Sequence, residues 1–246
     1  MKFTIIIFAI LMICTKHICA QQDSVVRESF ISSYSGYIAS AALISYGVIG
    51  KVHDELREID EEAYDEVLEN INRRYRVDDY IQYAPAIAVY GLDLIGVKAK
   101  HNVRDRTIVM ATSHLIMFGT VRTSKIFTNI ERPDGSNFKS FPSGHTAMAF
   151  TGAHVVFKEY KDASLWVGLS GYAVATATGL LRVVNNKHWI SDVAAGAGVG
   201  VISAELGYLL LPIFQSLLGD GGKDKGLVVA PVAGSNHYGI GMVYTF

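Results

Sequence analysis

Five apolar segments occupy most of the chain between residues 83 and 218, and they constrain the fold more than any other feature. The segments cover about 83–97, 107–121, 145–157, 164–184 and 190–218. Each is long enough for several helical turns, and the last two are long enough to cross a bilayer, whereas the three shorter ones also fit buried core helices. The pattern predicts an all-α bundle of about five to six helices, embedded in a membrane.

The composition narrows the class of protein further. The mean hydropathy is +0.26 and 18% of the residues are charged, which lies between an ordinary soluble enzyme and a protein densely packed with membrane spans. The 22 basic and 23 acidic residues give a net charge of -1, so no basic excess indicates a nucleic-acid partner. No obligatory protein partner is indicated either.

The N-terminus resembles an export signal. Lys2 is followed by an apolar run from Phe3 to Cys14, so residues 1–20 are interpreted as a signal peptide. An uncleaved signal anchor is the alternative, because Ile18 is larger than the residue usually found three positions before a cleavage site. Both alternatives place the rest of the chain outside the cytoplasm. Both cysteines lie within this segment, which excludes a disulfide framework and a thiolate zinc site from a cleaved protein.

An acidic region precedes the apolar segments. Nearly half of the chain's 23 acidic residues fall between Lys51 and Tyr80. Apolar residues recur there at steps of three or four from Val52 to Ile71, which predicts a helix with one apolar stripe and a solvated charged face. The stretch 34–49 is short for a membrane span and fits a packed or interfacial helix. Residues 21–82 therefore form an N-terminal region with an acidic amphipathic helix.

The remaining boundaries follow from composition. Residues 83–218 are predicted to form the helical domain, and the Gly- and Ala-rich last helix allows close approach of its neighbours. Residues 219–246 are predicted to be a linker followed by a short strand-like tail. The alternation from Tyr238 to Phe246 has the period of a half-buried strand, in either an edge hairpin or a docked tail.

Three polar clusters interrupt the apolar segments. Taken alone, Lys125 and Arg132 fit ordinary surface charges. The Pro-Ser-Gly-His run from Pro142 to His145, taken alone, fits a turn before a capped helix. The lone histidines His114 and His154 are interpreted as satisfied buried imidazoles. The clusters are Lys125 with Arg132; Pro142, Ser143, Gly144 and His145; and Arg182 with His188 and Asp192.

Together the clusters make one chemical proposal, a site for a phosphoryl group. A helix start at Ser143 and Gly144 directs unpaired N–H groups and the positive end of the helix dipole at an anion. Lys125 adds a compact charge, and the arginines add planar guanidinium groups suited to phosphate oxygens. His188 and Asp192 are four residues apart at a helix start, so the carboxylate can accept one imidazole proton and leave the other nitrogen as a nucleophile. His145 can then protonate the departing oxygen.

This combination resembles the type 2 phosphatidic-acid phosphatase superfamily, which includes bacterial class A acid phosphatases and vanadium haloperoxidases. All three signature blocks occur in the family's order and with its internal spacing between residues 125 and 192. The helical pattern extends the resemblance to about 83–218. Leu181 departs from the family, which usually has Ser before this Arg, and the gap between Pro133 and Pro142 is short for a substrate lid.

The resemblance implies a role for each matching residue. His188 would form a phosphohistidine, Asp192 would orient it, and His145 would be the general acid. The phosphate would be held by Lys125, Arg132, Ser143, Gly144 and Arg182. The resemblance also implies a phosphatase that uses no metal and no cofactor.

Basic residues outside the clusters predict an orientation. If 107–121 crosses a membrane, two basic loops lie opposite the catalytic clusters, and the positive-inside rule makes those loops cytoplasmic. The loops carry Lys98, Lys100, Arg104 and Arg106, and Lys158 and Lys161. The active site is therefore expected to face the periplasm from the inner membrane of a bacterial cell envelope.

A phosphorylated membrane lipid is the expected substrate. The arrangement of export signal, acidic amphipathic insert, compact bundle and Phe-ended tail resembles that of envelope phosphatases that act on lipid A, so this resemblance implies lipid A, particularly its 4'-phosphate. Phosphatidylglycerophosphate, phosphatidic acid and undecaprenyl diphosphate are the alternatives within the same class. A soluble exported acid phosphatase of broad specificity is the second expectation. A haloperoxidase is disfavoured because such enzymes are generally longer, and a non-enzymatic membrane protein is disfavoured by the complete set of catalytic residues.

Overall fold

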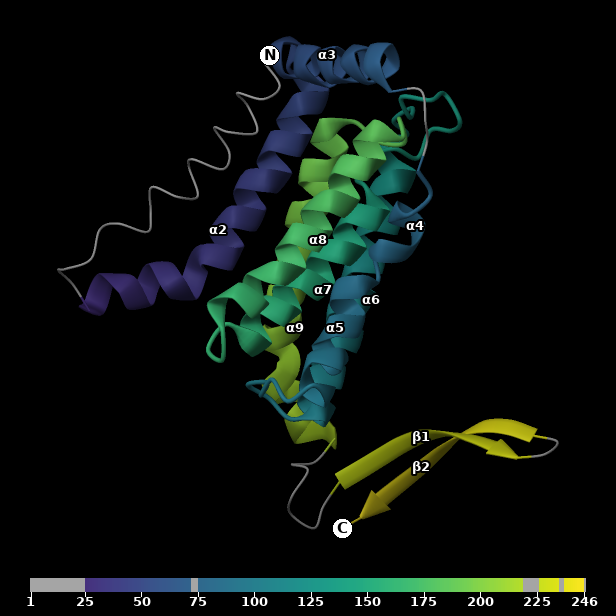
Figure 1. Cartoon of the computed structure of the whole chain (residues 1–246). Helices are drawn as coiled ribbons and strands as arrows, with labels where there is room; N and C mark the ends of the chain where they lie inside the picture. Colours follow the sequence, from purple (N-terminus) through teal and green to yellow (C-terminus); the bar gives the residue numbers. More distant parts are fainter. Residues whose placement is uncertain (1–24, 72–74, 219–225, 235–236, 246) are drawn as a thin grey trace. The chain divides into compact units, whose positions relative to one another are not determined.

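The computed structural model describes residues 25–71, 75–218, 226–234 and 237–245. Within these residues the chain forms eight helices and one antiparallel pair of strands (Figure 1). The elements are α2 (Val25–Val52), α3 (Asp54–Asn70), α4 (Asp78–Ile81), α5 (Ala84–Leu94), α6 (Val103–Thr128), α7 (Gly144–Tyr160), α8 (Leu165–Val184), α9 (Ile190–Leu218), β1 (Gly226–Gly234) and β2 (His237–Thr245). The helical class expected from the sequence is confirmed. The helix count is larger than five to six because the N-terminal region contributes three helices of its own.

Helix α7 is the central element of the bundle. Most of its residues are buried, and it packs against α5, α6, α8 and α9. Its small residues let the neighbouring backbones come close: a Cβ at Gly152 would lie 2.7 Å from the backbone nitrogen of Ala86 in α5. Packing of α7 against four other helices fixes its position in the bundle, and with it the position of its first turn.

Helix α9 uses glycines for three separate close contacts, as the sequence predicted. A Cβ at Gly198 would lie 2.8 Å from the carbonyl oxygen of Ser40 in α2, and one at Gly200 would lie 2.6 Å from that of Ala147 in α7. The third glycine, Gly207, approaches α6. Backbone atoms cannot move aside for a side chain, so the Gly-rich sequence of α9 sets the distances between these helices.

The helix predicted from Val52 to Ile71 is present as α3, and it begins at Asp54. His53 adopts an extended conformation (φ -108°, ψ 122°) between α2 and α3. Ala63 and Val67 form the buried stripe of α3, whereas Val52 is 78% exposed and does not belong to it. Most acidic side chains of α3 are exposed, which confirms the solvated face, but Asp60 is buried.

The end of the bundle formed by the last turn of α7 is rich in buried charges. Arg106 is 1% exposed and donates hydrogen bonds at 2.8 Å to the carbonyl oxygen of Val89 and to the hydroxyl of Tyr160. Its other partner is Asp93, at 2.5 Å. Arg106 is therefore a structural residue inside α6, not the loop charge that the sequence suggested.

Two histidines in the bundle have the structural roles that the sequence suggested. His154 lies between Glu205, at 2.7 Å, and the hydroxyl of Tyr172. Nδ1 of His114 lies 2.8 Å from the carbonyl oxygen of Met110 within α6. Both imidazoles are satisfied within the bundle.

The C-terminal strands form a hairpin in which Gly226 pairs with Thr245 and Gly234 pairs with His237. This confirms the strand-like tail. The signal segment at 1–20 and most of the predicted linker, residues 219–225, lie outside the described residues. The chain forms two compact units, and the second begins at Gly36. The site described below lies entirely within the second unit.

Two of the described helices, α8 and α9, are long and apolar enough to cross a membrane. In their most apolar stretches, 33% of the residues of α8 and 56% of those of α9 are buried inside the protein. α8 therefore presents the more exposed apolar surface of the two.

We predict that Gly200→Ala destabilises the bundle, because the added methyl group meets the backbone of α7 at Ala147 and Thr151. The expected loss is about 1–3 kcal/mol, as for other overpacked cores. The matched control is Gly119→Ala in α6, where nothing lies within 4 Å of the new Cβ, and where alanine is the better helix former. Thermal unfolding in detergent measures both variants, and an equal melting temperature for the two would contradict the packing described for α9.

Candidate active site

The first turns of α7 and α9 are joined directly. The backbone N–H of Ser143 donates to the carbonyl oxygen of Asp192 at 3.0 Å. A Cβ at Gly196 would lie 2.5 Å from the carbonyl oxygen of Ser143, so only glycine allows this approach. Two clusters that are about fifty residues apart in the sequence are thereby held together by main-chain contacts.

The helix start expected at Ser143 and Gly144 is confirmed. Ser143 is the N-cap of α7, and its hydroxyl oxygen accepts hydrogen bonds from the backbone N–H of Thr146, at 3.4 Å, and from the hydroxyl of Thr146, at 2.8 Å. Gly144 is the first helical residue, and the N–H groups of a first turn point out of the helix end. The start of α7 therefore offers N–H donors and the positive end of its dipole.

His188 and Asp192 form a buried pair. His188 is 1% exposed and Asp192 is fully buried. Nδ1 of His188 lies 3.5 Å from Oδ2 of Asp192, and it has no hydrogen-bond partner within the described part of the chain. The sequence suggested that His188 and Asp192 both lie at the start of a helix. α9 begins at Ile190, so His188 lies in the turn before it. The turn nevertheless brings the two side chains to the same place.

Asp192 is held by several other groups. Its Oδ2 accepts hydrogen bonds from the hydroxyl of Ser140 and, at 3.0 Å, from the backbone N–H of Trp189. Its Oδ1 lies 3.0 Å from the ammonium group of Lys51 in α2. A carboxylate with this many donors and a cation beside it is stabilised in its ionised form and fixed in orientation.

Lys125 and Arg132 come from the end of α6 and the loop after it. The ammonium group of Lys125 donates to the carbonyl oxygens of Lys139, at 2.6 Å, and Ser140, at 3.3 Å. Nε of Arg132 donates to the side-chain oxygen of Asn137 at 3.2 Å. These bonds fold the loop between α6 and α7 back over the end of α6. They also keep both positive charges beside the buried pair.

Arg182 lies in the last turn of α8, where the negative end of the helix dipole favours a cation. It is 6% exposed, and its guanidinium group lies 2.5 Å from Asp78 of α4. The neighbouring Asp79 lies 3.1 Å from Nε2 of His145. Helix α4 thus places one carboxylate on the arginine and one on the imidazole of the first turn of α7.

The electrostatics follow from burial and from the gathering of cations. Burial lowers the pKa of His188 to about 3, the carboxylate of Asp192 opposes this, and the charges of Arg132 and Lys125 add to the lowering. Burial, together with the charge of Arg132, lowers the pKa of Lys125 to about 8. Burial, followed by the charge of Arg182, lowers the pKa of His145. His188 is therefore a neutral imidazole at physiological pH, beside a concentration of positive charge.

The structure brings the eight residues singled out from the sequence to one end of the bundle. They are Lys125, Arg132, Ser143, Gly144, His145, Arg182, His188 and Asp192. Arranged in this way, they provide a neutral imidazole on a carboxylate, a second imidazole, and three cations at a helix start. Such a set can bind an anion and transfer a group that carries negative charge.

Other residues at this end were missed. Lys51, Asp60, Asp78 and Asp79 contact the site from the N-terminal region, and Ser140 contacts it from the loop before α7. Of these residues, Asp60 is the one whose burial the sequence could have indicated, because it lies next to the apolar stripe of α3. The others are polar residues in polar segments, where the sequence does not distinguish a contact from solvent.

Part of the chain is similar in sequence to known proteins. The family model described as PAP2 superfamily matches residues 106–215. A curated relative named lipid A 1-phosphatase, from Porphyromonas gingivalis, is 40% identical over 134 residues, which cover 54% of this chain and 30% of the relative. The bacitracin transport permease protein BcrC of Bacillus licheniformis is 41% identical over 66 residues, 26% of this chain and 30% of that protein. The chain thus matches less than a third of the length of either relative.

Two solved structures are similar at lower identity. The crystal structure of Aquifex aeolicus LpxE has 22% identity and a TM-score of 0.46, and the match covers 60% of this chain and 93% of that one. The crystal structure of a transmembrane PAP2-type phosphatidylglycerolphosphate phosphatase from Bacillus subtilis has 19% identity and a TM-score of 0.42, over 78% of this chain and 99% of that one.

We predict that the site binds inorganic phosphate and that binding weakens as the pH rises through about 8, because Lys125 then loses its charge. The expected loss between pH 7.5 and pH 9.5 is about tenfold, the equivalent of one charge-assisted hydrogen bond. In Lys125→Arg the loss should disappear, since a guanidinium group stays protonated over this range. Titration calorimetry in detergent measures both proteins. The same pH dependence in the parent and in Lys125→Arg would contradict the assignment of this lysine.

Proposed function

We propose that the chain is a phosphatase that removes a phosphate from an envelope lipid through a phosphohistidine at His188. The match of residues 106–215 to the PAP2 superfamily model supports the proposal. One observation carries the proposal: a buried neutral imidazole, backed by the carboxylate of Asp192, is surrounded by three cations and a helix start. Neutral imidazole is a nucleophile, and the cations match the charge of a phosphoryl group.

In the first step, Nε2 of His188 attacks phosphorus while the bond between phosphorus and the lipid oxygen breaks. His145 enters this step protonated, a form that the carboxylate of Asp79 stabilises at 3.1 Å. It donates its proton to the leaving oxygen, so the lipid leaves as an alcohol and His145 becomes neutral. Asp192, whose Oδ2 lies 3.5 Å from Nδ1 of His188, stabilises the positive charge that develops on the ring. Arg132 and Arg182 stabilise the negative charge on the phosphoryl oxygens.

In the second step, water attacks the phosphohistidine. Neutral His145 accepts a proton from the water, the bond between phosphorus and nitrogen breaks, and inorganic phosphate leaves. Both catalytic groups return to their starting protonation states. Lys125 and the N–H of Gly144 hold the phosphoryl group in both steps, and Ser143 keeps the helix start in place through its capping bonds.

The mechanism needs no metal ion. Three positively charged side chains around the reacting group disfavour a divalent cation at the same position. They supply the charge stabilisation that a metal provides in other phosphatases. The nucleophile is a side chain, so no metal-bound water is required.

Lipid A is the proposed substrate. The support is the similarity to a relative named lipid A 1-phosphatase, together with the lipid character expected from the sequence. The name of this relative favours the 1-phosphate, whereas the resemblance to envelope phosphatases favours the 4'-phosphate. We propose that the chain removes one of these two phosphates. The other lipid phosphates considered from the sequence belong to the same reaction class and serve as competing substrates in the test.

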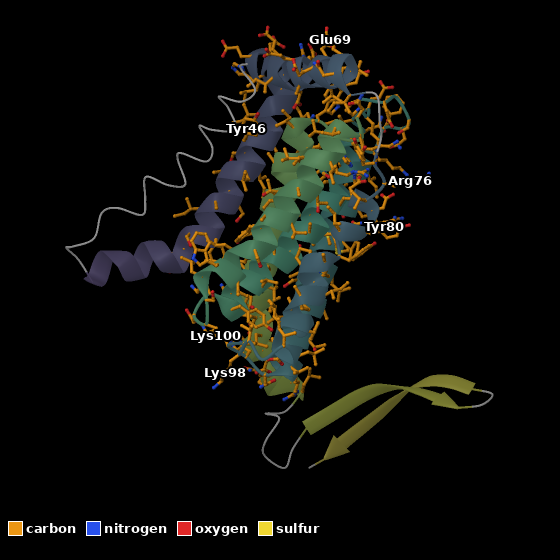
Figure 2. The ribbon with its side chains drawn as sticks, viewed as in Figure 1. Tyr46, Glu69, Arg76, Tyr80, Lys98 and Lys100 are labelled. Atoms are coloured by element: carbon orange, nitrogen blue, oxygen red, sulfur yellow. The ribbon has the colours of Figure 1, made fainter. Side chains whose placement is uncertain are left out.

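The proposed location is the bacterial inner membrane, with the active site facing the periplasm. α8 and α9 are long and apolar enough to span. Lys98 and Lys100 lie at the end of the molecule away from Glu69 of α3 (Figure 2), and the backbone N–H of Lys100 donates to Glu159 in the last turn of α7. The positive-inside rule assigns this basic end to the cytoplasm, which leaves the first turn of α7 outside.

We predict that the purified chain in detergent removes one phosphate from lipid A that carries both, and that His188→Ala removes none, because the variant lacks the nucleophile. The matched control is His114→Ala, which deletes an imidazole bonded within α6 and should keep nearly full turnover. Mass spectrometry of the lipid measures the loss, and its fragment ions identify the position.

Two results would contradict the proposal in different ways. Turnover of phosphatidylglycerophosphate or undecaprenyl diphosphate with lipid A left intact would replace the substrate. Turnover in His188→Ala equal to that of His114→Ala would overturn the mechanism.

A further inference from the structure

Asp60 is a buried carboxylate that the proposed mechanism does not use. It lies on the inner side of α3 and is 3% exposed, although its acidic neighbours on that helix face solvent. It accepts hydrogen bonds from the backbone N–H of Ser191, at 2.9 Å, and from the hydroxyl of Ser191. Ser191 precedes Asp192 in the first turn of α9, so α3 is tied to the residue next to the proposed catalytic carboxylate.

Lys51 connects the two carboxylates. Its ammonium group lies 3.2 Å from Oδ2 of Asp60 and 3.0 Å from Oδ1 of Asp192. The lysine side chain is 15% exposed, and its ammonium group also lies 5.6 Å from the ring centre of Trp189. A cation between two buried carboxylates stabilises the ionised form of both, whereas either one alone would be costly to bury as an anion.

We infer that Lys51 and Asp60 are positioning residues for catalysis: they hold the carboxylate of Asp192 ionised and oriented, with Oδ1 on Lys51 and Oδ2 towards His188. The inference rests on the proposed function, since it assigns a role to groups behind the proposed nucleophile. Neither residue contacts the phosphoryl group. Lys51 acts on Asp192 directly, and Asp60 acts through Lys51 and Ser191.

The two oxygens of Asp192 have separate tasks in this arrangement. Oδ1 is 3.0 Å from Lys51, and Oδ2 is shared by the donors from Ser140 and Trp189 and by His188. Rotation of the carboxylate would exchange these partners and separate the lysine from its counter-ion. Lys51 therefore opposes rotation, and it does so from a helix outside the three sequence clusters.

The lysine also adjusts the charge that His188 experiences. The charged groups facing this imidazole are Asp192 from α9, Lys125 from α6 and Arg132 from the following loop. Lys51 balances part of the negative charge of Asp192, so its removal leaves the carboxylate more effective at stabilising protonated His188. Removal of the lysine thus raises the pKa of His188, and the neutral nucleophile is lost at a higher pH.

The test compares Lys51→Met with the parent over the acid side of the pH profile of kcat. We expect kcat to fall at least tenfold at neutral pH with little change in KM, because substrate contacts are intact. We also expect the acid limb to move upward by about one pH unit. The titration of the substrate is common to both proteins and cancels in the comparison. A purely structural loss would lower activity without moving the limb.

Two further variants keep the test independent of folding. Lys51→Arg retains the charge and should recover most of kcat and the parent's acid limb. Lys51→Met combined with Asp60→Asn removes the lysine and one carboxylate, so it should fold at least as well as Lys51→Met. The kcat of the double variant should be no lower, since residues that act through one partner are not additive.

Arg57→Met is the matched control. It removes one positive charge from the same region, but its guanidinium group is exposed and pairs with Asp54 and Glu61 on the surface of α3. We expect its kcat and acid limb to equal those of the parent. Equal profiles for Lys51→Met and Arg57→Met would overturn the inference, as would an unmoved acid limb in Lys51→Met with kcat reduced.

His188→Ala is measured in the same series to separate the two proposals. If His188→Ala is inactive and Lys51→Met behaves like the parent, the positioning role is wrong and the phosphatase mechanism stands. If His188→Ala remains active, the proposed function itself fails.

Discussion

The buried carboxylate of Asp192 is the constraint on which the rest of the site depends. Its side chain gathers donors from Ser140 and Trp189 and an ammonium group from Lys51, while its own carbonyl oxygen binds the N–H of Ser143. A buried anion is costly without such partners, so the loops and helix ends that supply them are held in place by the same interactions. The alignment of the two catalytic helix starts is a consequence.

Close helix packing is the second requirement. The glycines of α9 bring α2, α6 and α7 to backbone contact, and Gly196 does the same at the level of the site. Side chains at the ends of helices packed this tightly have little freedom to move. The cations therefore repel one another without separating. Burial is the main cause of the lowered pKa of Lys125, and the charge of Arg132 adds to it. A bound phosphoryl group relieves the repulsion, which favours binding of an anion in the proposed reaction.

Much of this site was predictable from the sequence, because helix starts, caps and spacing are local properties. The N-cap at Ser143 and the helix after it follow from four consecutive residues, and α9 begins where its apolar pattern begins. The buried histidines of the bundle were also predictable. Contacts between distant segments were not: nothing in the sequence pairs Lys51 with Asp192, or Asp78 with Arg182, because such pairs depend on how the helices pack. The start of α3 was predicted two residues too early, because Val52 keeps the apolar spacing of the stripe although the chain is extended at His53.

The central claim is that His188 becomes phosphorylated during turnover, and direct trapping of the intermediate tests it best. The protein is mixed with lipid substrate, quenched rapidly in base to preserve phosphohistidine, digested and analysed by mass spectrometry. The account predicts phosphate on His188 within the first turnover, and an increased amount in His145→Ala if its second step is slowed more than its first. Phosphate on another residue, or none on His188 while lipid is being dephosphorylated, would contradict the account.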